Sequence, residues 1–150
     1  MLTHFGHVWH ISQSQVYNIL TRLEARDFIT GSVQEQAKLP ARRQFRLTAT
    51  GRQRFEAWLH MPTRPSVRAI RVEFITRLYF ARARSIQLAS DMIATQAAQT
   101  LADVERLRRM LADLPAEQVF DQLGLELRIR QLAAISDWLD NCRVALDIDT

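Results

Sequence analysis

The sequence is poor in residues that break helices and in residues that cross-link chains. Its 150 residues include four glycines, four prolines and one cysteine, Cys142. A lone cysteine excludes a disulfide framework and a zinc finger, so we expect a reducing, cytoplasmic setting. No apolar run reaches the roughly 18 residues of a membrane helix, and residues 1–12 do not resemble a signal peptide. With 47% apolar residues, this composition favours a mainly helical protein with a core.

Lysine is also nearly absent, because 19 of the 20 basic residues are arginine. Residues 1–84 contain 14 Lys or Arg and 5 Asp or Glu, a balance of +9, whereas residues 85–150 contain 6 and 11, a balance of −5. The sum is the +4 of the whole chain. A GC-rich genome favours arginine, but the excess coincides with the helix described next. We therefore expect a polyanion to meet the first half only.

Residues 11–24, ISQSQVYNILTRLE, predict a short helix with two unlike faces, begun by the N-cap residue Ser12. A surface helix normally presents Glu and Lys to solvent, but this one has no acid before Glu24. Its outer face instead carries groups that reach base edges and phosphates, which indicates a DNA recognition helix rather than an ordinary surface helix. The apolar face holds Val16, Ile19, Leu20 and Leu23, and the outer face holds Ser14, Tyr17, Asn18, Thr21 and Arg22.

A β-hairpin is predicted next, from strand-like residues 28–35, a turn at 36–41 and a strand at 42–47. The return strand alternates with period 2, placing Phe45 and Leu47 inward. A helix followed by a hairpin with a basic tip is the order of a winged helix-turn-helix, whose wing touches the neighbouring minor groove or backbone. The alternative is a solvated hairpin.

The candidate DNA contacts fall into three groups. Base-edge contacts are expected from Gln13, Ser14, Gln15 and Asn18. Phosphate contacts on the helix are expected from Ser12, Tyr17 and Arg22, and these two groups could exchange members. Phosphate contacts on the wing are expected from Lys38, Arg42 and Arg43.

The best domain boundary follows the next helix. Thr48 caps that helix, and Gly51 within it is either a minor defect or a place of close packing. Pro62 and Pro65 then mark a linker. We expect a DNA-binding domain over 1–61 and a helical domain over 66–150.

The second domain is expected to contain three helices, over about 66–82, 85–114 and from Pro115 onward, with Pro115 at the start of the last one. Apolar residues recur every seven positions in both long helices, which predicts an antiparallel pair. Because such a pair leaves apolar faces exposed, we expect it to associate with a second copy.

Other constellations carry weaker signals. His4, His7 and His10 recur every three residues without a nearby cysteine or carboxylate, so a metal site is disfavoured. Trp58 and Trp138 either pack in the core or stack an aromatic effector between subunits. No phosphate loop or nucleophile motif is present, so we expect neither an enzyme nor a cofactor.

Several blocks resemble PadR-type transcriptional regulators: FGHVWHIS at 5–12, SQVYNILTRLE at 14–24, FRLT at 45–48 with Gly51 and Trp58-Leu59, and VEF at 72–74 leading to LYF at 78–80. The resemblance implies a homodimeric winged-helix repressor, less often an activator. It places Ser14, Tyr17 and Asn18 on the DNA face and Phe74, Leu78 and Phe80 in the dimerisation region. The expected dimerisation residues, including the heptad leucines of the last helix, are Phe74, Leu78, Phe80, Leu125, Leu132 and Leu139.

Two departures from the family pattern stand out. The family usually has glycine where Asp27 stands, and Asp27 lies just after the first helix, where a residue with positive φ is expected. The family also begins with a helix and most of a second one ahead of Phe5-Gly6. We therefore expect a winged helix shortened at its N-terminus, followed by a helical dimerisation domain.

The expected function is that of an effector-responsive, homodimeric repressor that binds a near-palindromic operator in duplex DNA and is nucleoid-associated in the cytoplasm. A small aromatic molecule is the expected effector. The alternative is a DNA-binding-deficient interaction protein that dimerises through 66–150 and modulates a full-length partner.

Overall fold

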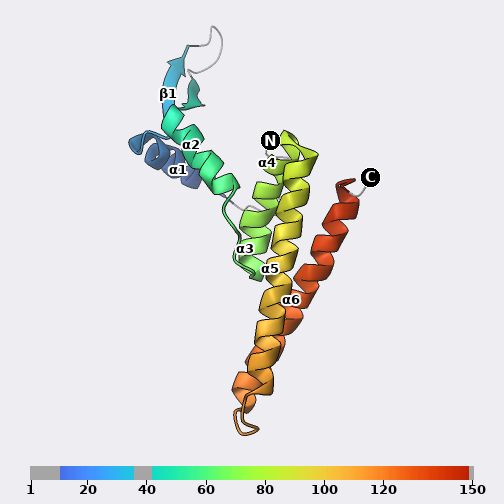
Figure 1. Ribbon diagram of the computed structural model, residues 1–150. Coiled ribbons are helices and arrows are strands. Elements are labelled where there is room, and N and C mark those ends of the chain that lie inside the picture. Colours follow the sequence, from blue (N-terminus) through green and yellow to red (C-terminus); the bar gives the residue numbers. More distant parts are fainter. Residues whose placement is uncertain (1–10, 36–41, 149–150) are drawn as a thin grey trace. The chain divides into compact units, whose positions relative to one another are not determined.

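The computed structural model describes residues 11–35 and 42–148, and the chain divides into two compact units between Met61 and Pro62 (Figure 1). The first unit is a helix, a two-stranded sheet and a second helix. The second unit, over its described residues 62–148, contains helices and no strand. The fold is therefore mainly helical, with one small antiparallel sheet.

The first unit contains α1 (Gln13–Ala25), β1 (Ile29–Gln34), β2 (Arg42–Leu47) and α2 (Ala49–Leu59). The strands pair antiparallel in a register that runs from Ile29 opposite Leu47 to Gln34 opposite Arg42. The predicted strands of 28–35 and 42–47 are thus confirmed within one residue at each end. Thr48 caps α2 as expected, because its hydroxyl oxygen accepts a hydrogen bond from the Gly51 amide at 2.9 Å.

Gly51 marks a place of close packing rather than a defect. A Cβ atom at this position would lie 1.8 Å from the carbonyl oxygen of Phe28. The absence of a side chain therefore allows the first turn of α2 to approach the backbone that leads into β1. Ile29, the first residue of β1, is buried.

Both ends of α1 are closed by local hydrogen bonds. At the start, the Ser12 hydroxyl accepts from the Gln15 amide at 3.3 Å and the Gln15 side chain accepts from the Ser12 amide at 2.9 Å, which makes a capping box. At the end, the Phe28 amide donates to the Leu23 carbonyl and the Asp27 amide to the Glu24 carbonyl, both at 2.9 Å. Asp27 has φ 54°, so it takes the left-handed position expected from the sequence.

The second unit begins with one continuous helix made of α3 (Val67–Ala69), the π-helical turn η1 (Ile70–Phe74) and α4 (Ile75–Arg84). The long helices α5 (Ile86–Ala112) and α6 (Val119–Ala145) run side by side in opposite directions (Figure 1). Ser66 and Ser85 cap their helices as expected. The expectation for Pro115 was wrong: it lies in the turn between α5 and α6, and the last helix begins four residues later.

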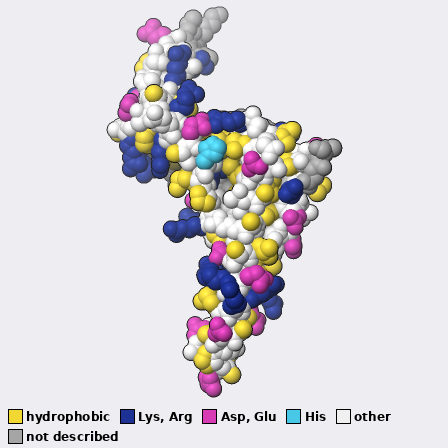
Figure 2. Space-filling view, in the orientation of Figure 1, with side chains coloured by type: hydrophobic (Ala, Val, Ile, Leu, Met, Phe, Trp, Pro, Cys, Tyr) yellow, Lys and Arg dark blue, Asp and Glu magenta, His cyan; other side chains and the backbone are white. Residues whose placement is uncertain are grey.

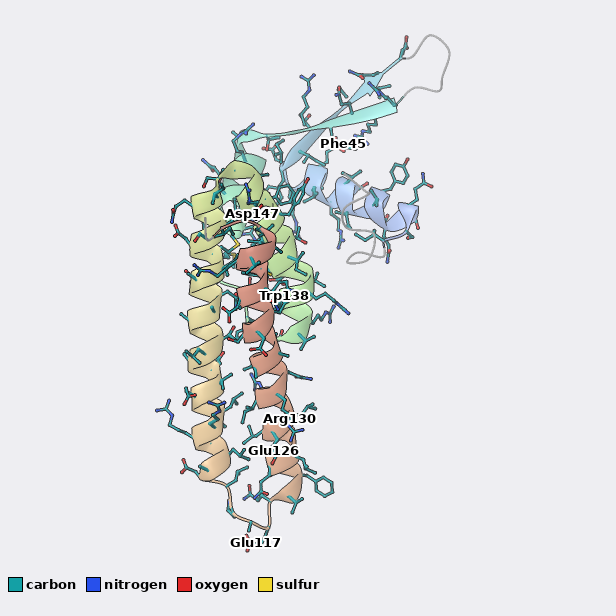
Figure 3. All side chains as sticks on the ribbon, turned by 90° about the vertical axis from the view of Figure 1, so that its right-hand side faces the viewer. Phe45, Glu117, Glu126, Arg130, Trp138 and Asp147 are labelled. Atoms are coloured by element: carbon teal, nitrogen blue, oxygen red, sulfur yellow. The ribbon has the colours of Figure 1, made fainter. Side chains whose placement is uncertain are left out.

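The core of the second unit runs along the seam between its helices. Phe74 of η1 and Trp138 of α6 meet edge to face, with ring centroids 6.1 Å apart (Figure 3). The seam also contains buried polar groups, including Thr100, whose hydroxyl donates to the Gln96 carbonyl at 2.8 Å. The buried apolar residues of this unit are Ile70, Phe74, Leu78, Ala81, Ala89, Ile93, Val104, Leu107, Leu132, Ile135 and Leu139.

The heptad pattern of α5 is only partly reflected in burial. Ile93, Thr100 and Leu107 are buried as the seven-residue spacing predicts, but Ile86 at the start of the series is 48% exposed. None of the helices in the described ranges is long and apolar enough to cross a bilayer.

Candidate nucleic-acid interface

The outer face of α1 is open to solvent. Ser14, Asn18 and Arg22 are exposed and the Tyr17 side chain is 60% exposed. Residues separated by three or four positions share one helix face, so these four side chains form a continuous strip. The strip contains no acidic residue, and neither does the first turn of α1. Hydroxyls, an amide, a phenol and a guanidinium are thus presented together.

Ser12 and Gln15, two of the residues predicted to contact DNA, form the capping box of α1. The Gln15 side-chain oxygen accepts the Ser12 amide, and the Ser12 hydroxyl lies 3.1 Å from the Ser14 hydroxyl. Ser12 and Gln15 therefore order the start of the helix. Gln13 is exposed beside them.

The apolar side of α1 is not covered within the described residues. Val16 is 41% exposed and Ile19 is 37% exposed, while Leu20 and Leu23 are half-buried. No residue of α1 is buried.

The hairpin has one polar face. Cross-strand partners point to the same side of a sheet, so the pairs Thr30–Arg46, Ser32–Gln44 and Gln34–Arg42 share this face. The Gln34 side-chain oxygen accepts from Arg42 Nε at 3.2 Å and Nη2 at 3.1 Å, and the Gln34 side-chain nitrogen donates to Gln44 at 2.7 Å. Because glutamine is neutral, the positive charge of Arg42 is not neutralised by these bonds.

Arg43 lies on the opposite face of the hairpin, with Gly31 and Phe45. Figure 3 labels Phe45 on the hairpin. The Nη2 atom of Arg43 donates to both carboxylate oxygens of Glu24 in α1, at 2.8 and 2.7 Å, and its Cζ atom lies 5.2 Å from the centroid of the Phe45 ring. The structure therefore separates Arg42 and Arg43, which the sequence had grouped as phosphate contacts. The period-2 alternation of this strand already indicated the separation of Arg42 from Arg43. Arg43 and Phe45 are two positions apart, and such residues point to the same face of a strand.

The third expected wing contact, Lys38, lies outside the described residues, as do His4, His7 and His10. Figure 2 shows arginine side chains over the part of the surface formed by α1 and the hairpin. The described residues contain no group of three or more His, Cys, Asp or Glu side chains placed to hold a metal ion.

Most of the expected dimerisation residues are enclosed by the chain itself. Phe74, Leu78, Leu132 and Leu139 are buried in the core of the second unit, and Phe80 and Leu125 are half-buried. The large apolar side chains that remain exposed on α6 are others. They are Val119 at 51%, Phe120 at 89%, Leu123 at 55%, Leu127 at 59% and Val144 at 72% exposure.

Two groups of the second unit are perturbed by burial. Arg77 is 2% exposed, and burial lowers its pKa while the nearby Glu73 carboxylate partly opposes that change. Arg77 Nη2 donates to the Thr63 hydroxyl at 2.6 Å, which ties the linker to α4. Burial also raises the pKa of the Cys142 thiol to about 11, so the thiol is neutral near pH 7 and is a small apolar group.

A helix with an open polar face, followed by a two-stranded wing and a helical second unit, defines the winged-helix class of transcriptional regulators. Residues 1–57 match the transcriptional regulator PadR-like family, and residues 70–147 match the family described as virulence activator alpha C-term. Residues 1–57 therefore belong to the PadR-like family of transcriptional regulators.

One curated relative is the negative transcriptional regulator PadR of Bacillus subtilis, 29% identical over 103 residues. The match covers 69% of this chain and 56% of the relative, so the chain spans only about half the length of that protein.

Solved structures similar to this chain include proteins from Bacillus subtilis, Vibrio cholerae and Bacillus cereus. Bacillus subtilis PadR in complex with operator DNA is 24% identical with a TM-score of 0.44, over 96% of this chain and 84% of that one. The Vibrio cholerae virulence activator AphA is 21% identical with a TM-score of 0.44, over 97% and 84%. The PadR-like regulator BC1756 of Bacillus cereus is 20% identical with a TM-score of 0.44, over 98% and 84%.

Proposed function

We propose that this protein is a homodimeric repressor that binds a near-palindromic operator through α1 and the hairpin. The exposed, acid-free strip of α1 is the observation that carries this proposal. Amide side chains such as Asn18 pair with adenine edges in the major groove, and hydroxyls and arginines contact phosphates. Repression, rather than activation, is supported by the name of the curated relative, a negative regulator.

The hairpin supports the same proposal with a second basic surface. Arg42 and Arg46 lie on its polar face, away from the face on which Arg43 and Phe45 lie. A wing of this kind contacts the backbone or minor groove beside the groove that the helix enters. Arg42 keeps its charge while bonded to Gln34, so it is preorganised for a phosphate.

Dimerisation is part of the proposal because two recognition helices read two half-sites about one helical turn apart. The exposed apolar side chains of α6, Phe120, Leu123 and Leu127, are the surface that a second copy would cover. The six residues expected from the sequence then act mainly by shaping the helices, since four of them are buried within the single chain.

The proposed effector is a small aromatic molecule. An open hollow of about 280 Å³ lies between Pro65–Val67 and α6, and its lining includes Gly124, Arg128 and Gln131. A ligand there would touch both the linker and a helix of the second unit, so it could shift the population of DNA-binding conformers. Hydroxylated aromatic acids added to the protein–DNA complex should therefore release the DNA.

The deciding experiment is a gel-shift titration at several salt concentrations with a duplex that the protein selects from a random pool. The wild type should show steeply salt-dependent binding, because phosphate contacts release counterions. Tyr17→Ala combined with Asn18→Ala should abolish the preference for the selected duplex. Arg108→Gln on the exposed surface of α5 is the matched control and should change nothing.

A second candidate function is favoured by the exposure of Val16 and Ile19. In this alternative the chain dimerises through its second unit and modulates a longer partner without binding DNA. The same titration, paired with sedimentation of the protein alone, separates the two functions. A stable dimer that selects no duplex supports the interaction protein and contradicts the repressor.

A further inference from the structure

One carboxylate in the first unit connects three elements. Glu24 lies in the last turn of α1, and its Oε1 atom accepts a hydrogen bond from the backbone amide of Gly31 in β1 at 3.0 Å. Both of its oxygens accept from Nη2 of Arg43 in β2. Glu24 therefore ties the recognition helix to both strands of the wing.

The neighbouring atoms leave little room around this junction. A Cβ atom at position 31 would lie 2.7 Å from Arg43 Nε, 2.9 Å from Glu24 Oε1 and 3.0 Å from a ring carbon of Phe45. The absence of a side chain at Gly31 thus lets the carboxylate and the guanidinium reach the strand. Phe45 covers the guanidinium from the other side, with 5.2 Å between Cζ and the ring centroid.

We propose that Glu24 is a positioning residue for DNA recognition, which fixes the angle between α1 and the wing through Arg43 and Gly31. Arg43 then acts within this joint instead of contacting a phosphate. This inference rests on the proposed function, in which α1 and the wing bind one duplex. A helix and a wing that enter adjacent grooves must match the spacing of those grooves, so a loose joint weakens specific binding.

Because Glu24 is negatively charged, a positioning role and a merely solvated side chain predict opposite changes in DNA affinity when the charge is removed. An acidic residue near a polyanion repels it, so removing the acid should tighten binding if Glu24 were merely a solvated side chain. A positioning role predicts the opposite for the selected duplex. It predicts no loss for a duplex of scrambled sequence, which does not require an accurate match of helix and wing.

The variants needed for the test should fold. The side chain of Arg43 is 52% exposed and that of Glu24 is 27% exposed, and ion pairs of this kind contribute little to folding stability. Glu24→Gln removes the charge but keeps an oxygen that can accept the Gly31 amide. Glu24→Ala removes both functions, and Arg43→Lys keeps the positive charge while removing the guanidinium.

The experiment measures the affinity of each variant for the selected and the scrambled duplex over a range of salt concentrations. Glu24→Gln and Arg43→Lys should each weaken binding to the selected duplex by roughly five- to tenfold, which is about 1 to 1.4 kcal/mol. Binding to the scrambled duplex and the salt slope should stay at the wild-type values. Glu105→Gln removes the same charge from an exposed ion pair on α5 and should have no effect.

A second readout does not depend on DNA. Hydrogen exchange at the Gly31 amide should quicken in Glu24→Ala and stay slow in Glu24→Gln. If Glu24→Gln lost protection throughout α1, it would be misfolded, and Arg43→Lys would then decide the question.

Several outcomes would overturn the inference. If Glu24→Gln bound the selected duplex as tightly as the wild type, or more tightly, Glu24 would not be a positioning residue. A salt slope steeper by about 0.9 in that variant would show that Arg43 is a phosphate ligand normally masked by Glu24. If the wild type selected no duplex, the proposed function would fail and this inference with it.

Discussion

Polar side chains join the elements of residues 11–61, whereas apolar side chains join those of residues 62–148. In the first unit the connections include Glu24 to Arg43 and the Thr48 hydroxyl to the Asp27 carbonyl, the latter at 2.6 Å. Of the thirteen buried apolar residues in the described chain, only Ile29 and Leu59 belong to this unit. The other eleven line the seam between the helices of the second unit.

This difference assigns different tasks to the two regions. Apolar contacts are strong in sum but not directional, so they suit a scaffold that must stay folded. Hydrogen bonds and ion pairs are directional and individually weak, so they suit a surface whose side chains must be aimed. The proposed DNA-binding unit therefore depends on the directions of its polar contacts, and the second unit depends on the burial of its apolar side chains.

The largest effect should come from Gly51, where the first turn of α2 lies close against the backbone that leads into β1. Gly51→Ala would place a methyl carbon 1.8 Å from the Phe28 carbonyl oxygen, so α2 must move away from the start of β1. We expect a loss of about 3 kcal/mol or more from the first unit, because overpacking against backbone cannot be relieved by a rotamer change. Hydrogen exchange resolved along the chain should show faster exchange in residues 11–61 only.

Gly124→Ala is the matched control for that variant, since both glycines lie in helices. A Cβ atom at position 124 meets nothing within 4 Å. Alanine should therefore stabilise α6 by roughly 0.5–1 kcal/mol through helix propensity. Equal losses from the two substitutions would show that the close approach at Phe28 does not limit the first unit.

A cavity in the seam should be the next largest effect. Leu139 of α6 is fully buried, and Leu139→Ala should cost about 2–5 kcal/mol through lost burial and an unfilled cavity. Denaturant unfolding followed by helical circular dichroism measures the loss. Leu127→Ala, at a position that is 59% exposed, should cost little in dilute protein. A loss as large at Leu127 as at Leu139 would contradict the view that burial holds the second unit together.

The smallest effect should be seen at the end of α1. Asp27 has φ 54°, in the left-handed region. This conformation strains residues that have a Cβ atom, although it strains Asp and Asn less than most. Glycine adopts it with the least strain. Asp27→Gly should stabilise the first unit by about 0.5 kcal/mol, whereas Asp27→Ala should destabilise it by a similar amount. Both substitutions remove the carboxylate, so a shift of the same sign in thermal unfolding would indicate a charge effect and not backbone strain.

Much of the fold could be predicted because its signals are local. Ser12, Thr48, Ser66 and Ser85 were expected to begin helices, and each accepts a backbone amide as a cap does. Asp27 was expected at a left-handed position and is found there. Side-chain caps and strand alternation involve residues a few positions apart, so the sequence contains all the partners.

The parts that could not be predicted depend on distant partners. The contact between Glu24 and Arg43 spans 19 positions, and only the register of the hairpin brings the two together. The burial of Gln96 in an otherwise apolar seam also depends on which face of α5 meets α6. Pro115 was assigned to the wrong side of a turn because proline is compatible both with a first helical turn and with a loop.

The π-helical turn at Ile70–Phe74 has a consequence for chain length. In a regular α-helix, residues four apart drift by about 40° around the axis, so Ile70, Phe74 and Leu78 would leave a common line. The wider turn of η1 takes up that drift, and all three side chains are buried. The first helix of the second unit thus contains one residue more than regular α-helical winding would hold. Its buried side chains nevertheless stay on one line. A one-residue insertion or deletion between related chains would disturb the flanking helices least if it fell at this turn.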